Sequence, residues 1–167
     1  MIAIVNVSPQ WGIGSENHLL VHIRSDMRRF RQLTTGHTII IGRKTLETFP
    51  NGKPLPNREN VILTRDPDFA VEGAVIAHDL SELNSILSER EPDSVFVCGG
   101  EQIYRQLLPF CSDALVTLTD TAEPADRFFP NLNLLPNWVL RESGEKQYEN
   151  ETAFRFLRYT NNVVRSL

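Results

Sequence analysis

The fold of this chain is decided by the stretch Thr38-Ile39-Ile40-Ile41-Gly42-Arg43-Lys44-Thr45. A β-branched apolar run ends at a glycine and continues into helix-compatible residues, which indicates a buried strand leading directly into a helix. The same pattern returns in Val95-Phe96-Val97-Cys98-Gly99-Gly100-Glu101-Gln102-Ile103-Tyr104. At such strand ends glycine lets the backbone approach a ligand closely, beside the free N–H groups of a helix start.

Short apolar runs and helical patterns alternate along the chain. The strands that the pattern predicts cover residues 1–7, 38–41, 60–64, 74–77, 94–98 and 114–119, and the helices cover 25–34, 44–48, 80–89 and 101–108. Alternation of this kind predicts an α/β fold with three layers, in which helices cover both faces of a mostly parallel central sheet.

The pattern changes after Thr119. Residues 138–143 and 152–159 read as two strands with no helix between them, which predicts an antiparallel C-terminal hairpin at the edge of the sheet. We expect a single domain over residues 1–167. Residues 9–21 are polar and contain two glycines, and we expect an irregular loop of the kind that often closes over a ligand.

Composition narrows the class of protein. The chain has 167 residues, 41% of them hydrophobic, and a net charge of -4, which argues against nucleic-acid and membrane-surface partners. Two cysteines are too few for a disulfide framework, and no secretory signal or membrane-spanning run is evident, so we expect a cytoplasmic protein. His18 and His22 lack a third ligand nearby, so no metal is expected.

Asp26 is the one carboxylate between Ile23 and Leu33, and helical geometry puts it on the apolar arc with Met27 and Phe30. The opposite arc holds Arg24, Ser25, Arg28, Arg29, Arg31 and Gln32. An unpaired carboxylate in an apolar setting is costly, which makes Asp26 a candidate for ligand binding or proton transfer. The alternative is an acidic residue that favours the first turn of a helix and still reaches water.

Basic residues gather near the two glycine-terminated strands. Arg43 and Lys44 begin a helix, and Thr64 and Arg65 follow a third strand, so together they suit a dinucleotide bearing an extra phosphate. Neither glycine segment is a GxGxxG fingerprint or a P-loop, and a tight turn remains the alternative for each.

Two further residues are candidates for the wall of a substrate site. Arg58 follows the turn-rich Pro54-Leu55-Pro56-Asn57 and could clamp a carboxylate, with a solvated loop arginine as the alternative. Cys98 reads as a pocket-wall residue, because no histidine lies near it in sequence to activate a thiolate.

Several motifs occur together in a fixed order. They are Ile13-Gly14-Ser15-Glu16-Asn17, Asp26 with Phe30, Ile41-Gly42-Arg43-Lys44-Thr45, Pro54-Leu55-Pro56-Asn57-Arg58-Glu59-Asn60, Gly99-Gly100-Glu101-Gln102-Ile103-Tyr104, Thr117, and Asp126 with Phe129-Pro130. As a set, these segments resemble the dihydrofolate reductase family over nearly the whole chain. The resemblance implies NADPH-dependent reduction of 7,8-dihydrofolate to tetrahydrofolate, which serves one-carbon and thymidylate metabolism.

The resemblance also implies roles for individual residues. Asp26 would be catalytic, hydrogen-bonding the pterin 2-amino group and N3, with Thr117 supporting it. The substrate set is Ile4, Val5, Asp26, Met27, Phe30, Arg31, Phe49, Leu55, Arg58, Cys98, Tyr104 and Thr117. The NADPH set is Asn6, Ile13, Gly14, Asn17, Leu19, Gly42, Arg43, Lys44, Thr45, Leu63, Thr64, Arg65, Gly99, Gly100, Glu101, Gln102, Ile103 and Tyr104. Antifolate inhibitors would bind as well, and we expect a monomer.

The chain departs from the family pattern at three places. Leu20-Val21 stands where Pro-Trp is usual, Asn6 where a small apolar residue is common, and Leu46 where an aromatic is common. Two other functions stay open at this point. One is a pyrimidine reductase of the riboflavin pathway, and the other is a catalytically weak folate- or nucleotide-binding relative.

Overall fold

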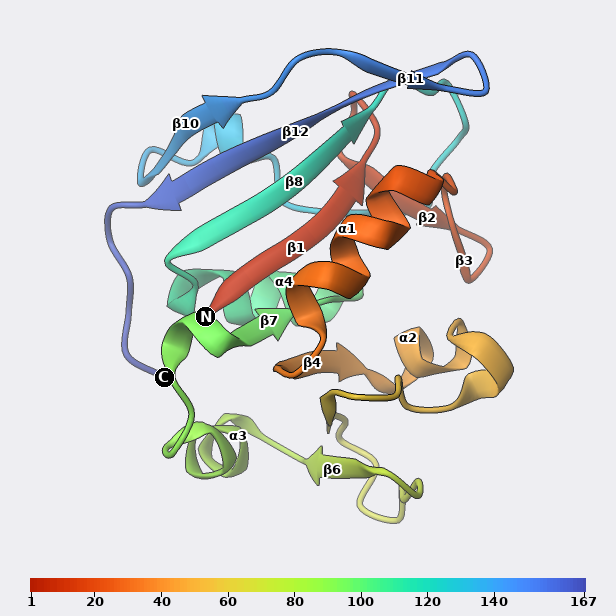
Figure 1. Ribbon diagram of the computed structural model, residues 1–167. Helices are drawn as coiled ribbons and strands as arrows, with labels where there is room; N and C mark the ends of the chain where they lie inside the picture. The colour runs from red at the N-terminus through yellow and green to blue at the C-terminus, as the bar shows by residue number, and fades with distance from the viewer.

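A nine-stranded sheet forms the centre of the molecule in the computed structural model, which describes residues 1–167. Its order is β10 (Trp138–Ser143), β12 (Thr152–Asn161), β8 (Asp113–Thr119), β1 (Ile2–Val7), β7 (Val95–Val97), β4 (Thr38–Gly42), β5 (Glu59–Leu63) and β6 (Ala74–Ala77), with β11 (Gln147–Glu149) added to β12. All pairs from β8 to β6 are parallel, and β12 pairs antiparallel with β8, β10 and β11. The mostly parallel sheet with an antiparallel C-terminal edge is therefore confirmed (Figure 1).

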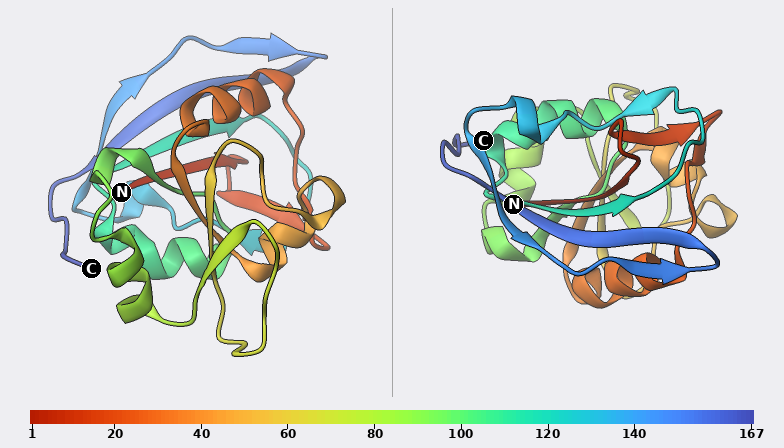
Figure 2. Two further views of the ribbon diagram at one scale, coloured as in Figure 1. Left: turned by 60° about the horizontal axis from the view of Figure 1, so that its bottom comes forward. Right: turned by 90° about the horizontal axis from the view of Figure 1, so that it is seen from above.

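Four α-helices flank this sheet: α1 (Arg24–Thr34), α2 (Arg43–Glu47), α3 (Leu80–Leu87) and α4 (Glu101–Leu107). Short 3-10 turns cover Pro50–Gly52, Pro92–Ser94, Leu108–Phe110 and Leu132–Leu134. Seen from above, α1 and α4 lie on opposite sides of the sheet (Figure 2). The expected three layers are confirmed. No helix in the molecule combines the length and the apolar character needed to cross a membrane.

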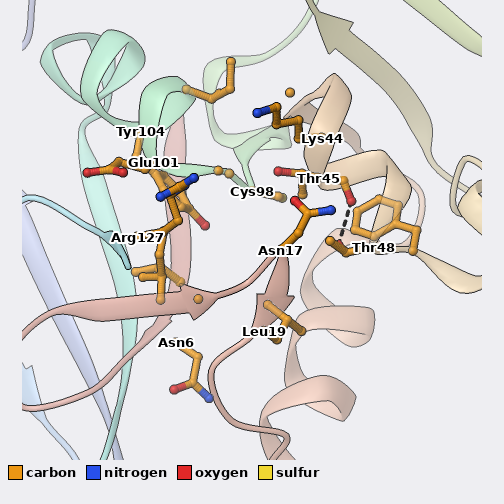
Figure 3. Close-up of a pocket in the computed structure, with 18 of the residues that line it drawn as sticks. Asn6, Asn17, Leu19, Lys44, Thr45, Thr48, Cys98, Glu101, Tyr104 and Arg127 are labelled. Atoms are coloured by element: carbon orange, nitrogen blue, oxygen red, sulfur yellow. Dashed lines mark hydrogen bonds between the residues drawn. The ribbon is translucent and has the colours of Figure 1, made fainter. Parts of the chain in front are cut away.

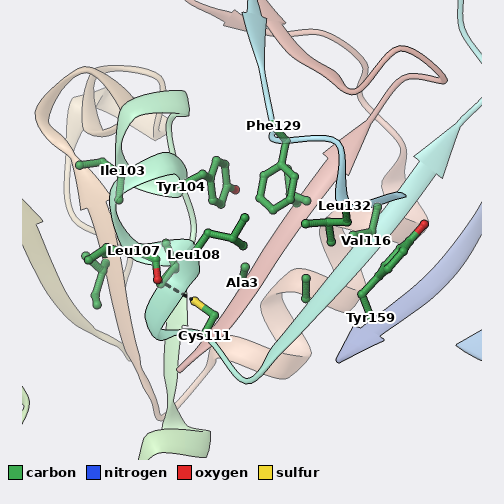
Figure 4. Close-up of a cluster of buried hydrophobic side chains, with 14 of the residues drawn as sticks. Ala3, Ile103, Tyr104, Leu107, Leu108, Cys111, Val116, Phe129, Leu132 and Tyr159 are labelled. Carbon is green, nitrogen blue, oxygen red and sulfur yellow. Dashed lines mark hydrogen bonds between the residues drawn. The ribbon is translucent and has the colours of Figure 1, made fainter. Parts of the chain in front are cut away.

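Strand β4 shows why the sheet is covered on both faces. Side chains alternate between the faces of a strand. Ile40 accordingly joins the larger core, whereas Ile39 and Ile41 join two smaller clusters on the other face, and all three are fully buried. The larger core lies between the sheet and helices α3 and α4, where Leu107, Leu108 and Phe129 pack together (Figure 4). A run that is apolar at every position therefore identifies a parallel strand between two helix layers.

The expectation of an irregular loop over residues 9–21 is wrong. Strands β2 (Gly12–Ser15) and β3 (His18–Leu19) form a hairpin there, and β9 (Arg127–Phe128) pairs with β2 to make a second, three-stranded sheet. The strands are short and polar, and the partner of β2 lies far along the chain, so no local apolar period marks them. At Gly14 an added β-carbon would lie 2.8 Å from the carbonyl oxygen of His18, so the hairpin leaves no space for a side chain at this position.

Helix α1, which carries Asp26, is held at its start by a residue from β11. The helix has no local side-chain cap. Glu149 instead accepts hydrogen bonds from the backbone N–H groups of Arg24 (2.5 Å) and Ser25 (3.1 Å), and from the Ser25 hydroxyl (2.9 Å). The N–H donated by Arg24, together with the two donors on Ser25, lowers the pKa of Glu149 below its ordinary value. This carboxylate joins the C-terminal strands to the helix at the site.

One arginine on the opposite arc of α1 packs against the sheet. The guanidinium carbon of Arg29 lies 4.3 Å from the centroid of the Phe156 ring on β12. Burial lowers its pKa, although Asp26 and Glu142 oppose the shift. The reason is tertiary: β12 crosses beneath this side of the helix and offers an aromatic surface to the cation.

Candidate functional site

A cleft of about 1470 Å³ opens at the carboxyl ends of the parallel strands. Residues at the ends of β1, β4, β5 and β7 form its floor, and α1, α2, α4 and the β2–β3 hairpin form its walls. Figure 3 shows Lys44 and Thr45 of α2 across from Asn17 of the hairpin, with Glu101 and Arg127 on another side. Ligands of open α/β sheets bind at this position, beyond the strand ends.

The first half of the cleft is mainly apolar. The residues of the expected substrate set that line it are Ile4, Val5, Asp26, Met27, Phe30, Arg31, Phe49, Leu55, Arg58, Cys98 and Tyr104. Thr117 is the exception, because it is buried behind Asp26 with 1% of its surface exposed. Met27 is 43% exposed, so the apolar arc of α1 faces an open cavity rather than packed core.

Asp26 lies on the cleft wall without a cationic partner. The Thr117 hydroxyl donates a short hydrogen bond to Oδ1, and the Asn6 amide donates to Oδ2 at 3.0 Å. No ion pair involves this carboxylate. It does stand in the first turn of α1, as the alternative interpretation held, but it faces the cleft rather than the outer surface. Each oxygen therefore has one protein donor and can accept another from a ligand.

Arg58 points its guanidinium toward the same half of the cleft. Its Nε donates to the Pro56 carbonyl at 3.0 Å, and Nη1 donates to the Thr34 hydroxyl at 3.2 Å. Asn60 pins the preceding turn by accepting from the Leu55 N–H and donating to the Leu55 carbonyl, both at 2.9 Å. Burial lowers the pKa of Arg58, and Arg31 adds to this effect. The side chain is therefore held in place with its remaining N–H groups free for an anion.

Cys98 and Tyr104 line the cleft but are not suited to acid–base or nucleophilic chemistry. Burial raises the pKa of the Cys98 thiol far above its ordinary value, so no thiolate is available near neutral pH. Burial likewise raises the pKa of Tyr104, and its hydroxyl donates to the Ile4 carbonyl at 2.7 Å. The sequence interpretation of Cys98 as a wall residue agrees with this geometry.

The second half of the cleft is basic and rich in glycine. All residues of the expected cofactor set line it: Asn6, Ile13, Gly14, Asn17, Leu19, Gly42, Arg43, Lys44, Thr45, Leu63, Thr64, Arg65, Gly99, Gly100, Glu101, Gln102, Ile103 and Tyr104. Arg43 lies 3.8 Å from Glu47, and Glu101 lies 3.1 Å from Arg105, both as i, i+4 pairs. Lys44 and Arg65 are exposed and form no ion pair.

Gly99 shows why this turn excludes other residues. Its φ of +114° lies in a region that L side chains rarely adopt, and an added β-carbon would stand 3.1 Å from the Tyr104 ring. Its carbonyl accepts the N–H of Gly42 at 2.8 Å, which brings the two glycine turns together. No side chain caps α2 or α4 at its start. Bare backbone and exposed cations are a donor set that fits a dinucleotide with an additional phosphate.

Several cleft residues were not part of the expected substrate and cofactor sets, although His18, His22, Leu20 and Val21 were discussed from the sequence. They are Ser8, Gly12, His18, Leu20, Val21, His22, Thr48, Pro50, Asp66, His78, Gln106 and Arg127. Arg127 is the most notable, because β9 places it opposite Gly14 of β2. His78 is held by a contact of 3.1 Å between Nδ1 and the Thr64 carbonyl. Only the neighbouring Asp126…Phe129-Pro130 motif could have drawn attention to Arg127 in the sequence.

The role of Asn6 also differs from its sequence assignment. It was grouped with the cofactor residues, and it does line the cleft. Its side-chain amide, however, contacts Asp26 and accepts a hydrogen bond from the Thr119 hydroxyl at 2.8 Å. The strand pattern could not reveal this, because the contact depends on how α1 crosses β1.

The strand ends of this α/β sheet carry an apolar pocket that contains one carboxylate, and beside it lies a basic groove lined by glycines. A site of this kind defines a dinucleotide-dependent enzyme. Comparison with known proteins gives the particular family. The family model described as dihydrofolate reductase matches residues 1–161. The dihydrofolate reductase of Bacillus subtilis (strain 168) is 37% identical over 149 residues, covering 88% of this chain and 86% of that protein.

Other relatives agree. The dihydrofolate reductase of Staphylococcus aureus (strain Mu50) is 34% identical over 141 residues, covering 84% of each chain. The solved structure of Enterococcus faecalis dihydrofolate reductase, complexed with NADP(H) and RAB-propyl, superposes with a TM-score of 0.85. It shares 28% identity and covers 96% of this chain and 95% of that one. This chain belongs to the dihydrofolate reductase family. It is an NADPH-dependent oxidoreductase, and the riboflavin-pathway alternative is not supported.

Proposed function

We propose that Asp26 is the catalytic residue in the reduction of 7,8-dihydrofolate to 5,6,7,8-tetrahydrofolate by this chain. The observation that carries the proposal is the geometry of this carboxylate. It lines the cleft, has one protein donor on each oxygen and has no cationic partner. Two parallel donors, such as the 2-amino group and N3 of a pterin, match the two remaining acceptor positions.

The apolar walls explain how a flat heterocycle is held beside the carboxylate. Ile4, Val5 and Phe30 line the cleft near Asp26, and Phe49 and Leu55 extend the apolar surface toward Arg58. Excluding water from this surface strengthens hydrogen bonds to the carboxylate. Arg58 then lies where the glutamate carboxylate of the substrate ends, and it is the candidate for a bidentate pair.

The reaction adds a hydride to C6 and a proton to N5 of the pterin. When bound, NADPH supplies the hydride. Asp26 has two tasks, which are to orient the pterin ring and to raise the proton affinity at N5, with water delivering the proton. Its carboxylate is the one acidic group on the apolar side of the cleft.

The cofactor groove is assigned from its donors. Lys44, Thr45, Thr64 and Arg65 would hold the 2′-phosphate and its neighbours, because they stand together at one end of the cleft. The backbone from Gly99 to Ile103 would hold the pyrophosphate, where the turn is free of side chains that could block it. These residues bind and orient the cofactor, and they take no part in proton transfer.

Two further assignments concern the oligomeric state of the chain and its location in the cell. We propose that the chain is a monomer, and sedimentation at micromolar concentration tests this. Cys98 and Cys111 are both free thiols, which supports the cytoplasm as the location. The proposed ligands are dihydrofolate and antifolates that compete for the same carboxylate.

The test is the variant Asp26→Asn, assayed by dihydrofolate-dependent oxidation of NADPH. We expect at least a 10²-fold loss of rate near neutral pH, because only one end of the uncharged amide can accept a hydrogen bond and the amide cannot favour a proton at N5. NADPH affinity, measured by fluorescence titration, should change little. Equal rates in the variant and the wild type would remove Asp26 from the mechanism.

The catalytically weak alternative rests on Val21, which lines the cleft where the family usually has tryptophan. Tight antifolate binding without measurable turnover in the wild-type protein would favour it. A parallel assay of Val21→Trp shows whether the missing indole limits the rate.

A further inference from the structure

Side-chain hydrogen bonds link Thr119, Asn6, Asp26 and Thr117 in a chain. The Asn6 Nδ2 donates to Asp26 Oδ2 at 3.0 Å, and the Thr117 hydroxyl donates to Oδ1. The Thr119 hydroxyl donates to Asn6 Oδ1 at 2.8 Å. Asn6 thus stands between a threonine that orients it and a carboxylate that it contacts.

The chemistry of the three groups permits only one orientation of Asn6. An ionised carboxylate only accepts hydrogen bonds, so Asn6 must turn its nitrogen toward Asp26. Its oxygen then faces Thr119, which is fully buried and has no water to bond instead. Turning the amide over would place its oxygen against the Asp26 carboxylate, which cannot donate, whereas the Thr119 hydroxyl can bond to either end of the amide.

Strand pairing makes this arrangement a property of the fold. Asn6 on β1 lies directly opposite Thr117 on β8 in the parallel register. Thr119 is two residues further along β8 and therefore on the same face. That face is the one that α1 covers, because the Asp26 carboxylate reaches both strands.

We propose that Asn6 is a positioning residue that fixes the rotation of the Asp26 carboxylate, so that one acceptor position on each oxygen is turned toward the substrate. The proposal rests on the proposed role of Asp26. Asn6 occupies the position where the family commonly has a small apolar residue, so this donor distinguishes the chain from the family pattern.

Asn6 orients the carboxylate without blocking it. A carboxylate offers about four acceptor positions, two on each oxygen. Thr117 uses one on Oδ1, and Asn6 uses one on Oδ2. One position on each oxygen remains, which suits a ligand with two parallel N–H donors.

Other charged and titratable groups near Asp26 do not replace this contact. Arg29 on α1 and Tyr104 on α4 interact with Asp26 through charge. Neither forms a hydrogen bond to it, because Arg29 lies over the Phe156 ring and the Tyr104 hydroxyl is used by the Ile4 carbonyl. Asn6 and Thr117 are the two side chains that bond to the carboxylate directly.

The test compares the wild type with Asn6→Ala, a substitution toward the small residue common at this position. Both proteins are assayed by dihydrofolate-dependent oxidation of NADPH, with each substrate varied in turn. Loss of the donor that fixes the carboxylate should raise KM for dihydrofolate about tenfold. KM for NADPH should stay unchanged, because the contact is with Asp26 alone, a split that a general loss of structure would not give.

Two variants of Thr119 separate positioning from general loss of structure. Thr119→Val removes the group that orients Asn6, and KM for dihydrofolate should rise by less than in Asn6→Ala. Thr119→Ser keeps the hydroxyl and should restore the wild-type KM. These variants also test the proposal if Asn6→Ala does not fold.

The outcomes are distinct from those of the proposed function. An identical KM for dihydrofolate in the wild type, Asn6→Ala and Thr119→Val overturns the role of Asn6, whatever Asp26 does. A raised KM together with full activity of Asp26→Asn instead overturns the role of Asp26, and with it the effect of Asn6 on reduction.

Discussion

Replacing Arg58 with alanine should weaken folate binding far more than it weakens the fold. The guanidinium is partly buried and is already held by the Pro56 carbonyl and the Thr34 hydroxyl. It also lies 6.0 Å from the centroid of the Phe30 ring. Because the side chain is ordered before the ligand arrives, a carboxylate gains its hydrogen bonds with little further loss of side-chain entropy.

The expected magnitude follows from this geometry. A charge-assisted hydrogen bond contributes about 1.5–3 kcal/mol, and two such bonds form in a bidentate pair. Solvent reaches Arg58 and screens part of that energy. We therefore expect Arg58→Ala to cost on the order of 2–4 kcal/mol of binding free energy, or roughly 30- to 900-fold in Kd.

Isothermal titration calorimetry with two ligands isolates the contact. The ligands are folate and its analogue in which the glutamate α-carboxylate is a neutral amide. In the wild type, folate should bind much more tightly than the amide, and in Arg58→Ala the difference should largely vanish. Arg58→Lys is the matched control, because it keeps the charge without the planar fork and should lie between the two. An undiminished preference for the acid in Arg58→Ala would show that the clamp lies elsewhere.

Three other predictions concern the helix start, the cofactor groove and the glycine turn. Glu149→Gln should lower Tm at pH 7, because a carboxylate whose pKa is lowered in the folded state stabilises the fold above its unfolded-state pKa. This effect is lost as the pH falls through the lowered pKa, so the two melting temperatures should converge in acid. Lys44→Ala with Arg65→Ala should reduce the preference for NADPH over NADH in initial-rate assays at least tenfold, and an unchanged ratio would refute the phosphate assignment. Gly99→Ala should lower the free energy of unfolding, measured by urea denaturation, by about 1–3 kcal/mol. The reasons are the positive φ of Gly99 and the contact of an added β-carbon with Tyr104, and equal urea midpoints would contradict them.

Local sequence patterns predicted the parts of the fold that depend on neighbours in the chain. The apolar run from Thr38 to Ile41 had to be a strand buried on both faces, because no polar side chain offers it a solvated face. Helical periodicity likewise turned Asp26 away from its neighbouring arginines, and the structure places it on the cleft wall. The glycines that end the two strands also line the cleft.

Contacts between distant segments could not be predicted in this way. The pairing of β2 with β9 joins residues near Gly14 to residues near Arg127, and neither segment has an apolar period of its own. The contact of Arg29 with Phe156 could not be predicted for the same reason, because β12 lies far along the chain.

The sequence by itself determined the order along the chain of the helices and of the main strands of the central sheet. It also determined the inward direction of Asp26 and the positions of the basic and glycine residues. These features follow from chain periodicity and backbone sterics. Only the tertiary structure decided what touches the carboxylate. Asn6 is 20 residues from Asp26, and its own partner Thr119 is 113 residues from it. A hydrogen bond requires contact within about 3 Å, and only the packing of α1 across β1 and β8 provides it.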